Sequence, residues 1–84
     1  MIEVRKPSEE ELKKLDVNSW PVWTKEKSKF DWYYDEKETC YIIEGEVVVR
    51  TKEGEEVRFE AGDLVTFPKG LSCEWEILKD VKKH

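Results

Sequence analysis

Residues 62–75, GDLVTFPKGLSCEW, carry the strongest fold signal in this chain. A Gly-Asp pair opens the stretch, strand-forming residues follow at 64–67, and Pro68-Lys69-Gly70 then interrupts them. A second strand is expected at 73–78, where apolar residues alternate with glutamates. Two strands joined by a Pro-x-Gly turn predict a hairpin-like corner.

Strand and turn signals continue on both sides of this stretch. Gly45 is expected to end one strand in a tight turn, and Lys52-Glu53-Gly54-Glu55 to close a hairpin. Many short strands with turn signals every ~8–12 residues predict an all-β antiparallel barrel or sandwich. The further strands expected cover residues 1–5, 30–35, 38–44, 46–51, 56–60 and 81–84.

One short helix is expected near the N-terminus. Ser8 and Glu11 have the spacing of a capping box, and the acidic residues Glu9 and Glu10 suit the first turn of a helix. The pattern predicts a helix over residues 9–15. With 84 residues, the chain is interpreted as a single domain covering residues 1–84.

The composition argues against several classes of partner. Charged residues make up 42% of the chain and the net charge is −5, without a basic patch interleaved with aromatic residues, so we expect no nucleic-acid partner. No apolar run and no signal-peptide pattern indicates a membrane or an export route, so a cytoplasmic protein is expected. Small domains have thin cores, and residues 38–44 are apolar on both faces, which favours a homodimer.

Two spaced motifs resemble those of the cupin superfamily. Glu38, six residues and Gly45 resemble the end of the first cupin motif. Gly62, five residues, Pro68-Lys69-Gly70, two residues and Cys73 resemble the second. The run GDLVTFPKG with its following tryptophan is similar to the cupin halves of (S)-ureidoglycine aminohydrolase. The resemblance implies a small antiparallel β-barrel of the jelly-roll type, here with one short N-terminal helix.

Metal-binding cupins use three histidines and a glutamate, a set that suits Mn, Fe, Ni or Zn. The resemblance places Glu38 at the glutamate position and Cys73 at the histidine position of the second motif. The only histidine of this chain is His84, at its end. We therefore expect no metal site and no cofactor, although a divalent metal stays possible.

The register of the first motif has two alternatives. Its two histidines fall either at Asp31 and Tyr33 or at Trp32 and Tyr34. Alternation favours the second, because Phe30, Trp32 and Tyr34 share one apolar face. Neither alternative supplies the missing imidazoles.

Glu38 and Cys73 are the candidate catalytic residues. A buried carboxylate without a cation is costly, so Glu38 either stays wet at the mouth of the barrel or works as a general acid or base. Alternation turns Cys73 inward, where a neighbouring carboxylate raises the thiol pKa and makes it a sluggish nucleophile. The alternative is that Cys40 and Cys73 are simply buried apolar residues.

The sequence supports three hypotheses for function. In the first, a metal-free pocket binds a small polar metabolite. In the second, the chain is an enzyme of the ureidoglycine-aminohydrolase type that acts on a small nitrogen-containing metabolite. In the third, aromatic side chains fill the interior and the chain is a structural module. The expected pocket residues are Trp32, Tyr34, Glu38, Cys40, Cys73 and Trp75.

Overall fold

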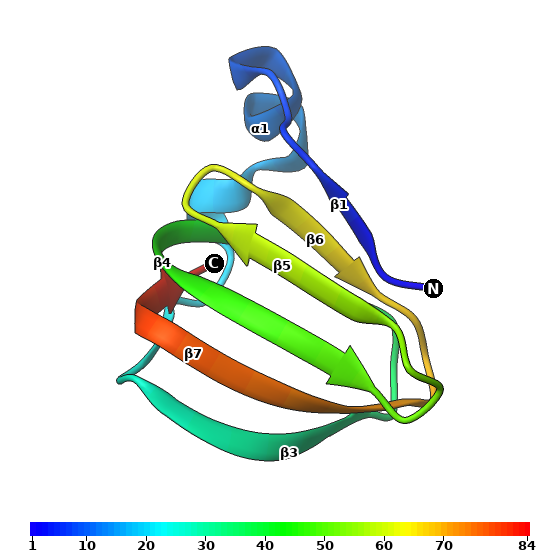
Figure 1. Cartoon of the computed structure of the whole chain (residues 1–84). Coiled ribbons are helices and arrows are strands. Elements are labelled where there is room, and N and C mark those ends of the chain that lie inside the picture. Colours follow the sequence, from blue (N-terminus) through cyan, green and yellow to red (C-terminus); the bar gives the residue numbers. More distant parts are fainter.

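The computed structural model describes residues 1–84 and consists almost entirely of antiparallel strands (Figure 1). No helix in it is long and apolar enough to cross a membrane. The elements, in chain order, are β1 (Glu3–Arg5), α1 (Glu9–Leu15), the 3-10 helix η1 (Val17–Ser19), β2 (Trp23–Lys25), β3 (Ser28–Tyr34), β4 (Glu38–Thr51), β5 (Glu56–Glu60), β6 (Leu64–Phe67) and β7 (Leu71–Lys83).

Two long strands, β4 and β7, organise the pairing. In the first sheet, β6 pairs with β1 on one side and with the beginning of β4 on the other. In the second sheet, the rest of β4 pairs with β5 and β7, and β7 also pairs with β3 and β2. All of these pairings are antiparallel, which confirms the predicted small β-barrel with one short N-terminal helix.

Helix α1 begins and ends where its sequence predicts. The Ser8 hydroxyl accepts a hydrogen bond from the Glu11 backbone N–H at 3.2 Å, which caps the first turn. Asp16 ends the helix in the left-handed conformation, with φ of 52°. None of its residues is buried, and the helix stands at one end of the barrel (Figure 1). It therefore adds nothing to the core.

The tight turn expected at Gly45 is wrong. Strand β4 runs unbroken through this residue, and only its pairing with β7 shifts register between Ile42 and Val47. Gly45 has φ of +109°, and a Cβ there would lie 2.6 Å from the carbonyl oxygen of Asp80 and 2.7 Å from the Cα of Val81. The glycine is needed because the backbones of β4 and β7 approach closely where the register between them shifts.

The hairpin-like corner expected at Pro68-Lys69-Gly70 is also wrong. Strands β6 and β7 flank this turn without pairing, because β6 pairs in the first sheet and β7 in the second. The Gly70 N–H donates a hydrogen bond to the carbonyl oxygen of Tyr34 at 2.7 Å, which ties the turn to β3. The turn therefore carries the chain across the barrel. Strand β7 then continues to Lys83 and joins the two strands expected at 73–78 and 81–84.

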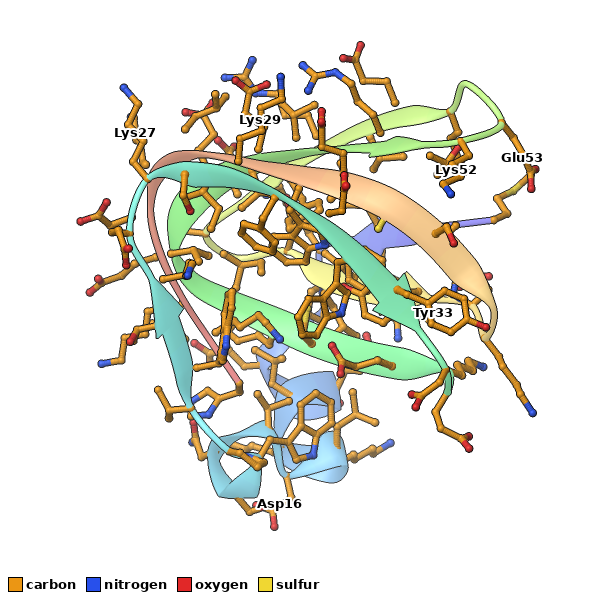
Figure 2. All side chains as sticks on the ribbon, turned by 90° about the horizontal axis from the view of Figure 1, so that it is seen from below. Asp16, Lys27, Lys29, Tyr33, Lys52 and Glu53 are labelled. Atoms are coloured by element: carbon orange, nitrogen blue, oxygen red, sulfur yellow. The ribbon has the colours of Figure 1, made fainter.

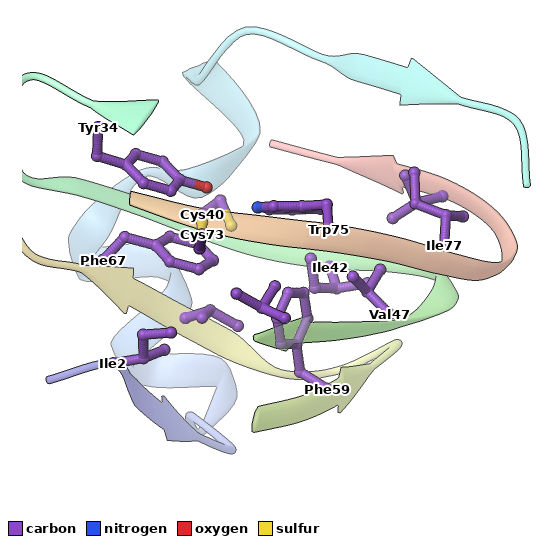
Figure 3. Close-up of a cluster of buried hydrophobic side chains, with 13 residues drawn as sticks. Ile2, Tyr34, Cys40, Ile42, Val47, Phe59, Phe67, Cys73, Trp75 and Ile77 are labelled. Carbon is purple, nitrogen blue, oxygen red and sulfur yellow. The ribbon is translucent and has the colours of Figure 1, made fainter. Parts of the chain in front are cut away.

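The core is thin and rich in aromatic rings (Figure 3). Tyr34 stacks on Phe67 with ring centroids 4.5 Å apart, and Phe67 in turn packs against Phe59 and Trp75. Only 17 of the 84 residues are buried, so these few large side chains supply much of the apolar burial. Charged side chains such as those of Lys29, Lys52 and Glu53 project outward (Figure 2).

Candidate functional site

An open pocket lies between strands β2 and β3, the beginning of β4 and the end of β7. Its volume of about 410 Å³ falls within the roughly 300–1,000 Å³ of small-molecule sites. Half of its 12 lining residues are aromatic: Trp20, Trp23, Phe30, Trp32, Tyr34 and Trp75. The polar lining residues are Glu38, Thr39, Cys40, Lys83 and His84.

The structure brings together most of the residues expected to line one pocket. Trp32, Tyr34, Glu38, Cys40 and Trp75 all face this pocket. Tyr34 is buried, whereas Trp32 is 49% exposed. Tyr34 therefore forms the inner wall of the pocket, and Trp32 stands at its open side.

Cys73 lies apart from this pocket, which corrects the expectation that it shares a cavity with Glu38. Its inward direction is confirmed, since the side chain is buried in the core. However, β7 pairs Cys73 with Trp32 of β3, and the thiol donates a hydrogen bond to the Trp32 carbonyl oxygen at 3.6 Å. Cys73 borders a second, more open hollow together with Asp31.

Lys83, which the sequence analysis did not single out, is the partner of Glu38. Its ammonium lies 3.6 Å from a carboxylate oxygen of Glu38 and 5.2 Å from the ring centroid of Trp23. The Lys83 side chain is only 14% exposed, whereas that of Glu38 is 49% exposed. Glu38 is therefore solvated at the mouth of the pocket, which is one of the two interpretations that the sequence allowed. Because this carboxylate is half exposed, its ion pair with Lys83 is weak. A lysine so distant in sequence gives no local signal of this role.

A hydrogen-bond donor without a partner lies on the inner wall of the pocket. Trp75 is 2% exposed, its ring stacks against Phe30, and the edge of the Trp23 ring meets it. Its indole N–H makes no hydrogen bond of good geometry, although it faces the hydroxyl of Tyr34 closely enough to lower the pKa of that hydroxyl in part (Figure 3). Such an unpaired buried donor costs about 1–3 kcal/mol. An acceptor brought in by a ligand removes this cost.

His84 connects two segments that border the pocket, one before β2 and one within β4. Nδ1 of His84 lies 3.0 Å from the carbonyl oxygen of Trp20, so this nitrogen carries the proton and donates it. The backbone of His84 exchanges two hydrogen bonds with that of Tyr41. The segment that leads into β2 is therefore held across the pocket.

Burial favours the protonated forms of the Tyr34 hydroxyl and of the two thiols. It raises the pKa of the Tyr34 hydroxyl far above its usual value, with Cys40 and Glu38 adding to the effect. Burial also raises the pKa of the Cys40 thiol to about 11; nearby Lys83 lowers it slightly and Glu38 raises it. The pKa of the Cys73 thiol is raised by burial and by the carboxylate of Asp31. Both cysteines are therefore poor nucleophiles at neutral pH.

We expect both cysteines to react with a thiol reagent far more slowly than a free thiol at neutral pH. The rate at Cys40 should still increase as the pH rises toward about 11, because its thiolate forms only there. Glu38→Gln should leave the Cys73 rate unchanged, since the carboxylate that raises its pKa belongs to Asp31. Labelling kinetics of Cys40→Ser and Cys73→Ser, with denatured protein as the control, measure each thiol alone. A Cys73 rate above that of a free thiol contradicts this expectation.

The donor atoms present do not fit a cupin metal centre. The structure contains no group of three or more His, Cys, Asp or Glu side chains arranged to hold an ion. The ammonium of Lys83 beside Glu38 adds a positive charge that opposes a bound cation. The one glutamate at the position of a metal ligand therefore has a lysine as its partner.

Two antiparallel sheets linked by β4, with a pocket open at one end of the barrel, define the class of protein as a cupin. A family model described as the EutQ-like cupin domain matches residues 12–84. The chain belongs to this family.

Solved structures agree with this assignment. A DUF861 family protein from Thermotoga maritima is 56% identical, with a TM-score of 0.99 over 100% of this chain and 96% of that one. The putative ethanolamine utilization protein Q of Salmonella typhimurium is 31% identical, with a TM-score of 0.66 over 74% of this chain and 50% of its own. The Clostridium difficile EutQ protein shares the fold at 22% identity, with a TM-score of 0.67 over 74% of this chain and 48% of its own. This chain therefore spans about half the length of the two EutQ proteins. No curated protein matches it.

Proposed function

We propose that this protein binds a small polar metabolite in the aromatic pocket, without a metal held by histidines. The observation that carries the proposal is a pocket of about 410 Å³ that is open to solvent and has in its wall Trp75, whose buried indole N–H makes no hydrogen bond of good geometry. Apolar walls with a few polar groups are typical of small-molecule sites. Glu38 and Lys83 place one charge of each sign on the same wall.

An enzyme of the ureidoglycine-aminohydrolase type is the second candidate. Glu38 supports it, because a half-exposed carboxylate inside an aromatic pocket is able to exchange protons with a ligand. Cys73 gives it no support, since its thiol lies outside the pocket and no histidine contacts it. Turnover of a small nitrogen-containing metabolite, abolished in Glu38→Gln, distinguishes this candidate from a binding protein.

The proposal is tested by screening tag-free protein against a library of small polar metabolites. Trp20, Trp23, Trp32 and Trp75 line the pocket, so binding should change the tryptophan fluorescence in a saturable way. Elemental analysis of the same sample should find far less than one transition metal per chain. Tyr33→Ala is the control, because this exposed side chain does not line the pocket and its loss should leave binding unchanged. A library without a single ligand, or a stoichiometric metal that is lost in Glu38→Ala, contradicts the proposal.

We also propose that the protein forms a homodimer. Strand β3 is hydrogen-bonded on one side only, to β7, and it exposes the large side chains of Trp32 and Tyr33. An edge strand with exposed aromatic side chains is a suitable surface for a second copy.

A further inference from the structure

We propose that the ligand of this pocket is a small organic carboxylate with a flat apolar body, bound through Lys83 and the indole N–H of Trp75. This inference rests on the proposed function and names the class of ligand. Its carboxylate accepts hydrogen bonds from these two groups, and its body lies among the aromatic rings.

Two polar groups of the pocket, the Lys83 ammonium and the Trp75 indole N–H, can only donate hydrogen bonds. Lys83 and Trp75 both contact the ring of Trp23, the ammonium at 5.2 Å and the indole at 6.0 Å from its centroid. The Tyr34 hydroxyl faces the Trp75 N–H and stays protonated, because burial raises its pKa (Figure 3). Glu38 supplies the only carboxylate side chain in the lining. A ligand that accepts hydrogen bonds with two oxygens complements such a set, and a carboxylate does so with about four lone pairs.

Of the two charged side chains in the pocket, Lys83 is more buried and more firmly positioned than Glu38. Lys83 is paired in register with Trp23 on one side and with Ile42 on the other, and its side chain is 14% exposed. Glu38 begins β4 at the mouth, and its side chain is 49% exposed. Their separation of 3.6 Å exceeds the ~2.7–2.9 Å of a charge-assisted hydrogen bond, so this pair is loosely made. A ligand anion can replace Glu38 beside Lys83 while Glu38 turns to water.

The shape and chemistry of the walls define the rest of the ligand. Phe30 and Trp75 are stacked with an interplanar angle of 18°, and Trp32 meets the edge of Phe30 at the open side. Flat rings pack against such walls in offset or edge-to-face arrangements. The body of the ligand is therefore expected to be an unsaturated ring rather than a charged chain.

Three probes of one shape test the charge that the pocket selects: benzoate, benzamide and benzylamine. Each is titrated into the protein while the backbone and indole N–H signals are followed by NMR. Benzoate should shift the Trp75 indole signal in a saturable way and should bind more tightly than the other two. Lys83→Met keeps the length and apolar contacts of the side chain and should weaken benzoate binding at least about tenfold.

The matched variants separate this role from a general effect of charge. Lys82→Met removes the same charge from an exposed neighbour on β7 and should leave benzoate binding unchanged. Lys83→Arg should retain most of the binding, and Glu38→Gln should bind benzoate as tightly as the wild type or more tightly. Circular dichroism of every variant confirms that the fold is kept.

Other results overturn the inference. Preferred binding of benzylamine that is lost in Glu38→Gln shows that the pocket recognises cations. Equal binding of benzamide and benzoate, or an Lys83→Met variant that binds like the wild type, removes the role of Lys83. A library metabolite without a carboxylate that binds while benzoate does not overturns the ligand class and leaves the proposed function standing. Failure of every compound to bind overturns both.

Discussion

Gly45→Ala is expected to destabilise the folded chain by about 4 kcal/mol, among the largest effects of a single substitution. The added Cβ would lie 2.6 Å from the Asp80 carbonyl oxygen and 2.7 Å from the Val81 Cα, and both are backbone atoms that cannot rotate away. The φ of +109° adds backbone strain of about 1–3 kcal/mol for any residue with a side chain. Small domains are stable by roughly 5–15 kcal/mol, so much of the margin is lost.

Gly54→Ala is the matched control for this prediction. Gly54 also has a positive φ, +95°, but a Cβ there meets nothing within 4 Å. The Gly54→Ala variant should therefore lose only the free energy of unfolding that is due to backbone strain, about 1–2 kcal/mol. Urea denaturation followed by tryptophan fluorescence gives both free energies of unfolding. Equal losses at the two positions contradict the close approach of β4 and β7 at Gly45.

Phe67→Ala should be the most damaging truncation in the core, with a loss of about 3–5 kcal/mol. Phe67 is fully buried, stacks on Tyr34 at 4.5 Å and contacts Phe59 and Trp75, so its removal leaves a cavity between aromatic rings. The variant should also bind ligands less well, because Tyr34 loses the ring that supports it beneath the pocket.

The size of the cavity, rather than the loss of any aromatic ring, is the reason for this expectation. Phe67→Leu fills part of the space and should lose less stability than Phe67→Ala. Tyr33→Ala removes an aromatic ring that is 58% exposed and should change stability by no more than about 0.5 kcal/mol. The same denaturation measurement ranks the three variants. A loss for Phe67→Ala below about 1.5 kcal/mol indicates a core that collapses around the gap.

Local signals predicted the local structure well. The spacing of Ser8 and Glu11 placed helix α1 at its observed bounds, and alternation in β3 put Trp32 and Tyr34 on the face that lines the pocket. The cupin motifs, which reflect a shared fold, placed Glu38 at the mouth. These features depend on residues close together in the sequence, or on a pattern that the family has in common.

The remaining features depend on contacts between distant strands. A glycine before a run of valines is compatible with a turn or with a close crossing, and only the position of β7 shows that Gly45 serves the crossing. Alternation turned Cys73 inward but could not show which part of the interior it meets. From the sequence alone, Lys83 is expected to be one more exposed lysine. Its position becomes clear only from the structure, in which it lies between β2 and β4.

The pairing of β7 has a consequence for how fast the barrel forms. This strand joins β2, β3 and β4 in one sheet, and it sets residue 83 opposite residue 23. Such pairings require a long loop to close, and its conformational entropy is lost before the strands make stabilising contacts. The entropic barrier to folding is therefore high. We expect folding in milliseconds to seconds despite the small size of the domain, in the range of all-β proteins with non-local contacts. Until β7 docks, the edges of β3 and β4 are open to other chains, and dilute conditions should favour correct refolding.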